Sequence, residues 1–313
     1  MKRIALLALA VLAILVAACK KSPVDNSSKP SVAWESNPSF TMMEIGVNMD
    51  ARVVFTVPEG VSSFVVKVTE IPIDLRGLLK KEITSDDNKR DLILDLVGDS
   101  NIRSAFPGFV SPSGLAGAKT VTLDFAKLLN KLTEGQLMEN DDRFTFDISM
   151  VDDDENRITQ TVRFRWTAAP EITFEPNRKS EIIYLIDTQD YTVENDKAII
   201  KAAGKIENIV ITFGGSKADP ALLNYVKSLT KRDASIDFTV DEKVAKAKVL
   251  ATSVSDFQGK TDFTITLGNL LMDFILFQTA DKDYVTDMTI EVSDVLGKKT
   301  TAVRHLGSEY NAK

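Results

Sequence analysis

Phe144-Thr-Phe-Asp-Ile-Ser-Met-Val151 alternates apolar with polar side chains, and 144 residues later Met288-Thr-Ile-Glu-Val-Ser-Asp-Val295 repeats the alternation. A period of two is typical of a β-strand that buries one face. A second alternating run follows each stretch after a short turn. The later turn, residues 293–298, carries the Asp and Gly that tight turns favour. The sequence therefore predicts a β-hairpin near the end of each of two repeats.

Further pairs of segments recur in the same order along the chain. They are residues 30–35 with 170–175, 60–68 with 204–212, 120–123 with 264–267, and 161–163 with 302–304. Offsets of 140, 144, 144 and 141 residues are nearly constant, which indicates a tandem duplication. We therefore expect one module at 32–169, a second at 170–307 and a C-terminal tail at 308–313.

Short alternating runs fill most of both repeats, and short helices interrupt them. Asp219-Pro220, for example, provides a helix cap and a first-turn proline ahead of an apolar stripe from Leu222 to Leu229. The end of the second repeat resembles the closing half of bacterial immunoglobulin-like domains. Its elements are a strand, a helix-like segment, a strand, the D-x-x-G-K turn at 294–298 and a last strand. The resemblance implies a mainly β fold of two tandem immunoglobulin-like β-sandwich modules with short helical insertions. The alternative is a pair of α+β modules.

The N-terminus carries a targeting signal. Lys2 and Arg3 precede an apolar run from Ile4 to Ala18, which is shorter than the roughly 20 residues of a membrane span but suits a secretory signal peptide. The run ends in Val16-Ala-Ala-Cys19, which resembles the lipobox of bacterial lipoproteins. That resemblance implies removal of residues 1–18 and a lipid on Cys19, the only cysteine in the chain. The alternative is an ordinary signal peptide with an incidental cysteine.

The residues after Cys19 bear on the membrane that holds the protein. Lys20 stands where an acidic residue would favour retention at the inner membrane in lipoproteins of this kind, so we expect the outer membrane. The sequence leaves open whether the modules face the periplasm or the exterior. Residues 20–31 are polar, with Ser, Pro and Asn, and cannot bury enough apolar area to fold. We expect residues 19–31 to form an acylated, flexible tether.

The whole pattern, a lipoprotein with tandem modules that each open on an aromatic-Glu strand, resembles a lipoprotein family of gut Bacteroidales with tandem immunoglobulin-like domains of unknown function. The motifs that carry it are Trp34-Glu35 and Phe174-Glu175 together with the signal that ends at Cys19. The resemblance implies a fold and a location, and it implies no site residues.

Composition excludes several classes of function. The chain has 38 basic and 45 acidic residues, and removal of the signal takes the formal charge from −7 to −9. Such an acidic chain has no electrostatic footprint for nucleic acid. One cysteine and one histidine exclude a disulfide framework and multi-histidine metal sites. We find no phosphate loop and no nucleophile motif, and we expect no cofactor.

Two stretches are candidate binding sites. Asp152, Asp154 and Asn156 have the spacing that opens a calcium loop, although the Gly and Glu that complete such a loop are missing; the alternative is a solvated hairpin tip. Phe106 and Phe109 lie in a Gly-, Pro- and Ser-rich stretch, where long loops are often functional. They are candidate ligand-binding rings unless the loop folds back and packs them.

From these observations we expect a lipid-anchored, non-catalytic envelope protein that binds or displays a ligand, such as a glycan or a partner protein of the envelope. A structural spacer in an envelope complex is the first alternative. A hydrolase that uses a pair of carboxylates is the second, because the separation of two carboxylates is a three-dimensional quantity.

Overall fold

The computed structural model describes residues 29–72, 75–77, 79, 92–177, 182–185, 195–249, 253–279 and 284–308. The expected signal peptide at 1–18, Cys19, most of the expected tether and nearly all of the C-terminal tail lie outside these ranges. No helix in the part of the chain that the structure describes is long and apolar enough to cross a bilayer.

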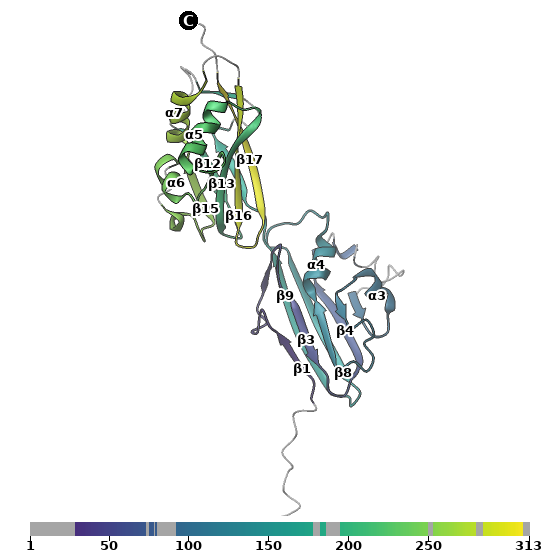
Figure 1. Cartoon of the computed structure of the whole chain (residues 1–313). Coiled ribbons are helices and arrows are strands. Elements are labelled where there is room, and N and C mark those ends of the chain that lie inside the picture. Colours follow the sequence, from purple (N-terminus) through teal and green to yellow (C-terminus); the bar gives the residue numbers. More distant parts are fainter. Residues whose placement is uncertain are drawn as a thin grey trace, which may run out of the picture. The chain divides into compact units, whose positions relative to one another are not determined.

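Among the residues that the structure describes, the first module contains nine strands and the helices α3 and α4 (Figure 1). The strands are β1 (Ser31–Trp34), β2 (Met43–Ile45), β3 (Arg52–Thr56), β4 (Val61–Glu70), β5 (Leu92–Asp95), β6 (Val110–Ser111), β7 (Thr120–Asp124), β8 (Arg143–Asp152) and β9 (Arg157–Trp166). The helices are α3 (Ser100–Ala105) and α4 (Phe125–Thr133). One sheet has the order β1-β3-β7-β6, and the other has the order β2-β9-β8-β4-β5.

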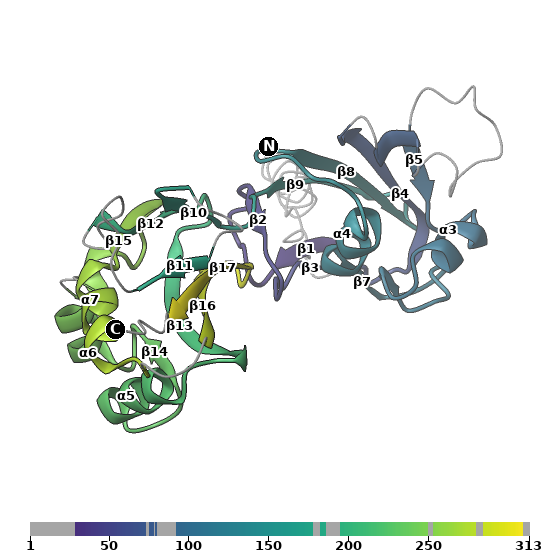
Figure 2. The same ribbon diagram turned by 90° about the horizontal axis from the view of Figure 1, so that it is seen from above.

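The second module repeats this arrangement. Its strands are β10 (Glu171–Glu175), β11 (Ile182–Tyr184), β12 (Lys197–Lys201), β13 (Ile206–Lys217), β14 (Ser235–Asp237), β15 (Asp262–Thr266), β16 (Tyr284–Asp294) and β17 (Lys299–Ser308). Its helices are α5 (Pro220–Thr230), α6 (Glu242–Lys248), η3 (Val254–Asp256) and α7 (Gly268–Phe277). The sheet orders are β10-β12-β15 and β11-β17-β16-β13-β14. Helices α5, α6 and α7 gather on one side of this module in both views (Figures 1 and 2).

Strand order identifies the fold class. In each module the first part of the chain contributes one strand to each sheet. β1 and β10 pair antiparallel with β3 and β12 in one sheet, whereas β2 and β11 pair parallel with β9 and β17 in the other. The first module thus has the A-B-E-D and G-F-C order of an immunoglobulin sandwich, with an extra edge strand beside C. The expectation of mainly β, immunoglobulin-like sandwiches with short helical insertions is confirmed.

Apolar residues from the two sheets of the first module meet in its core. Phe55 of β3 and Phe64 of β4 belong to different sheets, and their ring centroids lie 5.0 Å apart in an edge-to-face arrangement. Phe125 at the start of α4 lies 5.0 Å from Phe146 of β8. The alternation of β8 produces this core, because Phe144, Phe146 and their even-numbered neighbours are buried and the odd-numbered side chains face outward.

The structure corrects the alignment of the closing hairpins. Asp152 pairs with Val61 in the first module, and Asp294 pairs with Ile206 at the same place in the second. The hairpins are therefore offset by 142 residues, so the expected match of residues 144–151 with 288–295, at an offset of 144, is two residues wrong. The proposed match of Arg163 with Arg304 is one residue wrong: Arg163 is exposed and Arg304 is buried. A shift of one residue reverses the face of every side chain in a strand, so this correction matters for the site.

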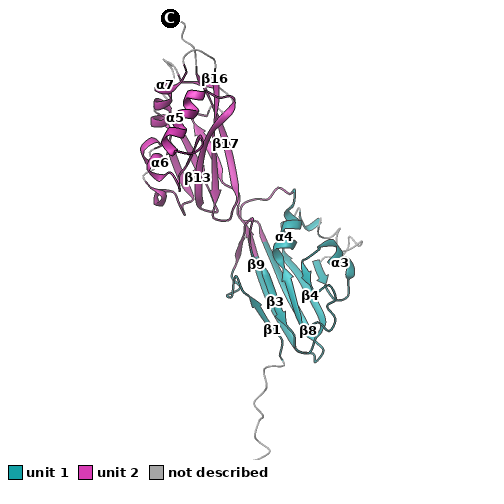
Figure 3. Cartoon of the chain, in the orientation of Figure 1, with its two compact units in different colours: residues 1–41, 50–135, 144–163 teal, residues 42–49, 136–143, 164–313 magenta. Residues whose placement is uncertain are grey.

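By its internal contacts the chain divides into two compact units (Figure 3). The first comprises residues 1–41, 50–135 and 144–163, and the second comprises 42–49, 136–143 and 164–313. The helix predicted after Asp219 is present as α5 in the second unit. The Asp219 side chain accepts a hydrogen bond from Ala221 N, Pro220 occupies the first turn, and Leu222 and Val226 are buried.

Candidate functional site

The outer face of the first module's larger sheet is the candidate site. Strands β8 and β4 both alternate, so each sends one set of side chains into the sandwich and the other set to solvent. On β8 the outward set includes Asp147 and Ser149, which are opposite Lys67 and Val65 of β4 in the strand register. Four neighbouring strands, β5, β4, β8 and β9, thus present a mixed polar and apolar surface.

This surface is hollowed. A cavity of about 770 Å³ lies over the four strands and is open to solvent. Its lining, called here the sheet hollow, combines apolar groups (Phe40, Val65, Ile93), hydroxyl groups (Ser149, Thr159, Thr161) and charged groups (Lys67, Asp147, Arg163). All of these residues belong to the first compact unit.

Phe40 is held in an unusual conformation at one edge of the hollow. Its φ of +50° lies in the left-handed region, which is costly for a bulky side chain. The loop around it is cross-linked: Phe40 N donates to Asn37 O at 2.9 Å, and Asn37 Nδ2 donates to Thr41 O at 2.6 Å. The ring also packs edge-on against buried Trp34, with centroids 5.6 Å apart. These contacts fix a partly exposed aromatic ring beside polar groups.

The charged groups in the hollow differ in their pairing. Asp147 Oδ1 accepts a 2.6 Å hydrogen bond from Thr161 Oγ1. Arg163, which is exposed on β9, makes no ion pair or side-chain hydrogen bond with any residue that the structure describes. An unpaired guanidinium offers five N–H donors to a ligand.

The same face of the second module carries different groups. With the offset of 142 residues, His305 occupies the place of Arg163, and its Nδ1 lies 2.7 Å from Asp287 Oδ1 on the neighbouring strand. In β13, the register relative to β4 places Thr212 where the first module has Lys67. Both cationic positions of the sheet hollow are thus lost in the second module.

A smaller hollow, of about 380 Å³, lies in the second compact unit. Three of its charged lining residues already bind one another: Glu44 accepts hydrogen bonds from Arg165, as well as from Thr167, and Arg165 also lies 3.6 Å from Asp141. Burial alone would raise the pKa of Glu44, but these bonds outweigh burial and lower it. Three of the four charged residues in the described lining are thus paired with one another, so this smaller hollow is the weaker candidate for a ligand.

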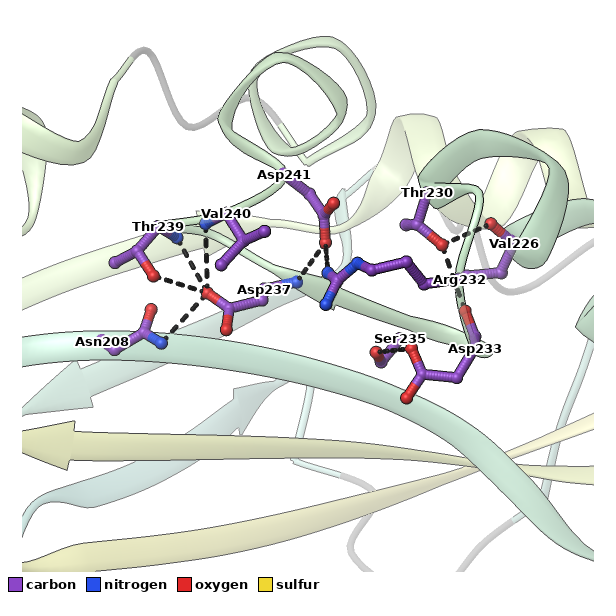
Figure 4. A network of polar contacts seen from close by, with 10 residues as sticks. All are labelled: Asn208, Val226, Thr230, Arg232, Asp233, Ser235, Asp237, Thr239, Val240 and Asp241. Carbon is purple, nitrogen blue, oxygen red and sulfur yellow. Dashed lines mark hydrogen bonds and ion pairs between the residues drawn. The ribbon is translucent and has the colours of Figure 1, made fainter.

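A polar network beside α6 is structural as well (Figure 4). Asp237 Oδ1 accepts from Asn208 Nδ2 at 3.0 Å and from Thr239 Oγ1 at 2.7 Å, and Asp241 accepts from the backbone N of Asp237 at 2.9 Å and from Arg232. Burial would raise the pKa of Asp237, and the bonds from Thr239 and Asn208 lower it overall. The carboxylates of Asp237 and Asp241 thus accept hydrogen bonds that stabilise the turn between β14 and α6.

The structure places Phe106 and Phe109 in the interior. Their side chains are 3% and 1% exposed, and the ring of Phe109 lies 5.4 Å from that of Phe125 in the core. The loop folds back because Phe109 O accepts from Asp124 N, the cap of α4, at 2.7 Å. Both rings are therefore packed in the interior, which is the alternative in which the loop folds back, and they are not available as exposed ligand-binding rings.

Asp152, Asp154 and Asn156 belong to the β8–β9 turn. Asp152 is 1% exposed, and its two carboxylate oxygens accept from Asn156 N at 2.7 Å and Asn156 Nδ2 at 2.9 Å. Only the next residues of the turn, including Asp154, are exposed, so the interpretation of a wholly solvated tip is wrong for Asp152. Among the described residues, no group of three or more His, Cys, Asp or Glu could hold a metal ion.

Comparisons with known proteins give low similarity. No protein-family model and no curated protein matches the sequence. Solved structures of fibronectin(III)-like modules of Clostridium thermocellum CbhA align with 90% of this chain and 97% of theirs, at 9% identity and a TM-score of 0.25. A Ca²⁺-stabilised ice-binding adhesin of an Antarctic bacterium aligns with 91% of this chain and 49% of its own, at 9% identity and a TM-score of 0.27.

A complex of Dpr2 Ig1-Ig2 with DIP-Theta Ig1-Ig3 also aligns, over 90% of this chain and 66% of that chain, at 9% identity and a TM-score of 0.26. At such scores these likenesses carry no argument about function. The immunoglobulin-like fold of this chain stands on its own strand order and register.

Proposed function

We propose that this protein is a non-catalytic binding protein of the cell envelope, and that its first module binds a glycan in the sheet hollow. The observation that carries the proposal is the partly exposed ring of Phe40, fixed in a left-handed conformation at the edge of a 770 Å³ hollow lined by hydroxyl groups. Strained backbone that the surrounding structure maintains is concentrated at functional sites.

The chemistry of the lining suits a sugar. The apolar C–H face of a pyranose packs on an aromatic ring, while its hydroxyls require hydrogen-bond partners. Phe40 supplies the ring, and Ser149, Thr159 and Thr161 supply hydroxyls that both donate and accept. Four strands spaced by about 4.8 Å make the hollow roughly 14 Å wide, which accommodates an oligosaccharide.

The carboxylates of the hollow do not favour hydrolysis. Glycosidases hold two carboxyl groups about 5–9.5 Å apart on either side of the scissile bond. Asp147 is the one acidic residue that lines the described hollow, and it accepts a hydrogen bond from Thr161. Binding therefore explains the site better than a carboxylate-based hydrolase does.

The lipid anchor is part of the same proposal. A lipid on Cys19 and the polar stretch that follows it would hold the modules at the outer membrane and let the sheet hollow reach a ligand. Acyl chains stabilise membrane binding by about 0.8 kcal/mol per buried CH₂, and two chains give stable anchoring.

The test uses soluble protein that begins at Ser22, applied to an array of oligosaccharides. We expect binding that Phe40→Ala weakens at least tenfold, because the ring supplies the stacking surface. The control is Phe277→Ala, which removes a phenylalanine that is 48% exposed on the second module. Absence of any bound glycan, or equal binding by Phe40→Ala and wild type, would overturn the proposal and leave the spacer as the better explanation.

A further inference from the structure

The charges of the sheet hollow indicate which class of glycan it binds. We infer that the ligand is an acidic oligosaccharide, one of whose uronate carboxylates binds Arg163. This inference rests on the proposed function and deepens it.

Arg163 is the first part of the argument. It lines the hollow from β9, is exposed, and has no ion-pair or hydrogen-bond partner within the described ranges. Some other arginines of the first module are paired: Arg165, two residues along the strand, donates to Glu44, and Arg52 donates to Asp50 at 2.9 Å. Guanidinium groups bind carboxylates through two parallel hydrogen bonds, so the free group of Arg163 fits an acidic ligand.

Lys67 also lines the hollow. It is opposite Asp147 in the register of β4 and β8, and both residues line the hollow. Because Lys67 already takes part in an interaction within the protein, Arg163 is the lining cation on which the inference rests.

The second module provides an internal comparison. His305 stands in place of Arg163 and is paired with Asp287, and Thr212 stands in place of Lys67. Its outer face also carries Glu291 where the first module has Ser149, since the offset in these strands is 142 residues. An acidic glycan would meet carboxylates there, so we assign the site to the first module alone.

The experiment compares each acidic ligand with its neutral counterpart. Short oligosaccharides of galacturonate, glucuronate and mannuronate are titrated into soluble protein beside the same compounds with their carboxylates methyl-esterified. We expect one uronate series to bind at least tenfold tighter than its ester, with an affinity that falls as salt rises from low to physiological concentration.

Two arginine variants separate a site from general attraction. We expect Arg163→Ala to weaken binding of the acid about tenfold and to leave the ester unaffected. Arg157→Ala is the matched control, because Arg157 is an exposed arginine on the same strand that does not line the hollow. Equal losses in both variants would overturn the inference in favour of non-specific charge attraction.

The remaining outcomes distinguish this inference from the function on which it rests. If acid and ester bind equally and Phe40→Ala weakens both, the ligand is a neutral glycan and the inference fails while the proposed function stands. If a sulfated glycan binds and no uronate does, the carboxylate assignment is wrong. If no glycan binds at all, or only a protein partner does, both proposals fail.

Discussion

Arg304 of β17 donates hydrogen bonds to the Asp196 carboxylate in the interior of the second module, and their side chains are 1% and 0% exposed. The first module has an apolar pair at the same two positions. Val162 corresponds to Arg304 by the hairpin register. Ala51 corresponds to Asp196 because both occupy the same place in the backbone hydrogen bonding. Ala51 O accepts from Phe125 N at the start of α4, and Asp196 O accepts from Leu267 N just before α7. The duplicated core thus contains a buried ion pair in one copy only.

This substitution predicts an asymmetric cost for single and double variants. Arg304→Val removes the guanidinium that pairs with a buried carboxylate and is expected to lower the free energy of unfolding by about 3–5 kcal/mol. The double variant Arg304→Val with Asp196→Ala recreates the pair of the first module and is expected to recover most of that loss. Urea unfolding of the soluble protein measures both. Additive losses in the double variant would show that the two side chains do not act as a pair.

Asp219 predicts a dependence of stability on pH. This buried carboxylate accepts from Ala221 N, from Thr279 N and Oγ1 and from Ser308 Oγ. Burial would raise the pKa of Asp219, but these bonds outweigh burial and lower it below its usual value. A carboxyl whose pKa is lower in the folded state stabilises the fold above the unfolded pKa, about 3.9, and this stabilisation is lost as pH falls through the folded pKa.

The matching variant is Asp219→Asn. We expect it to cost about 1–3 kcal/mol at neutral pH, because the amide cannot accept all of these bonds. Below pH 4 its stability should approach that of the wild type. Unfolding free energies measured from pH 2 to pH 7 check the expectation, and parallel profiles for the two proteins would contradict it.

Phe40→Gly should separate binding from stability. Glycine adopts a φ of +50° without strain, which returns about 1–2 kcal/mol, and loss of the edge contact with Trp34 costs about 0.5–1.5 kcal/mol. We therefore expect thermal unfolding close to that of the wild type, together with glycan binding at least tenfold weaker. Full glycan affinity in this variant would show that Phe40 is not part of the binding site.

Calcium should have no effect on the β8–β9 turn. Both carboxylate oxygens of Asp152 already accept hydrogen bonds from Asn156. We expect the midpoint of thermal unfolding to be the same in millimolar Ca²⁺ and in a chelator. A rise in the midpoint of thermal unfolding with Ca²⁺ that Asp154→Ala abolishes would support the calcium-binding hypothesis for this turn.

Cys19→Ser tests the proposed anchor. If a lipid is attached at residue 19, metabolic labelling with palmitate should mark the wild type and miss this variant, and the variant should leave the membrane fraction after signal removal. The lone cysteine makes the result specific. Equal labelling of both proteins would contradict lipidation at this residue.

The candidate site shows where prediction from sequence reaches its limit. Alternation in residues 157–166 already places Arg163 on the same face as Thr159 and Thr161. Nothing local indicates that Arg163 lacks a partner while Arg165 has Glu44, because Glu44 lies about 120 residues away and reaches β9 through a parallel pairing. The sequence does not indicate the left-handed conformation of Phe40 either, because phenylalanine rarely adopts a positive φ.

Sequence patterning determined the alternation of buried and outward residues and the capped helix after Asp219, because both depend on neighbours a few residues apart. It also indicated the recurrence of one module, because similar short segments recur in the same order. Tertiary structure decided that Phe106 and Phe109 are interior, that Arg304 is buried against Asp196, and that Arg163 and Phe40 line one hollow. The physical reason is that burial and pairing depend on strands brought together from distant parts of the chain, where a shift of one residue reverses the face that a side chain occupies.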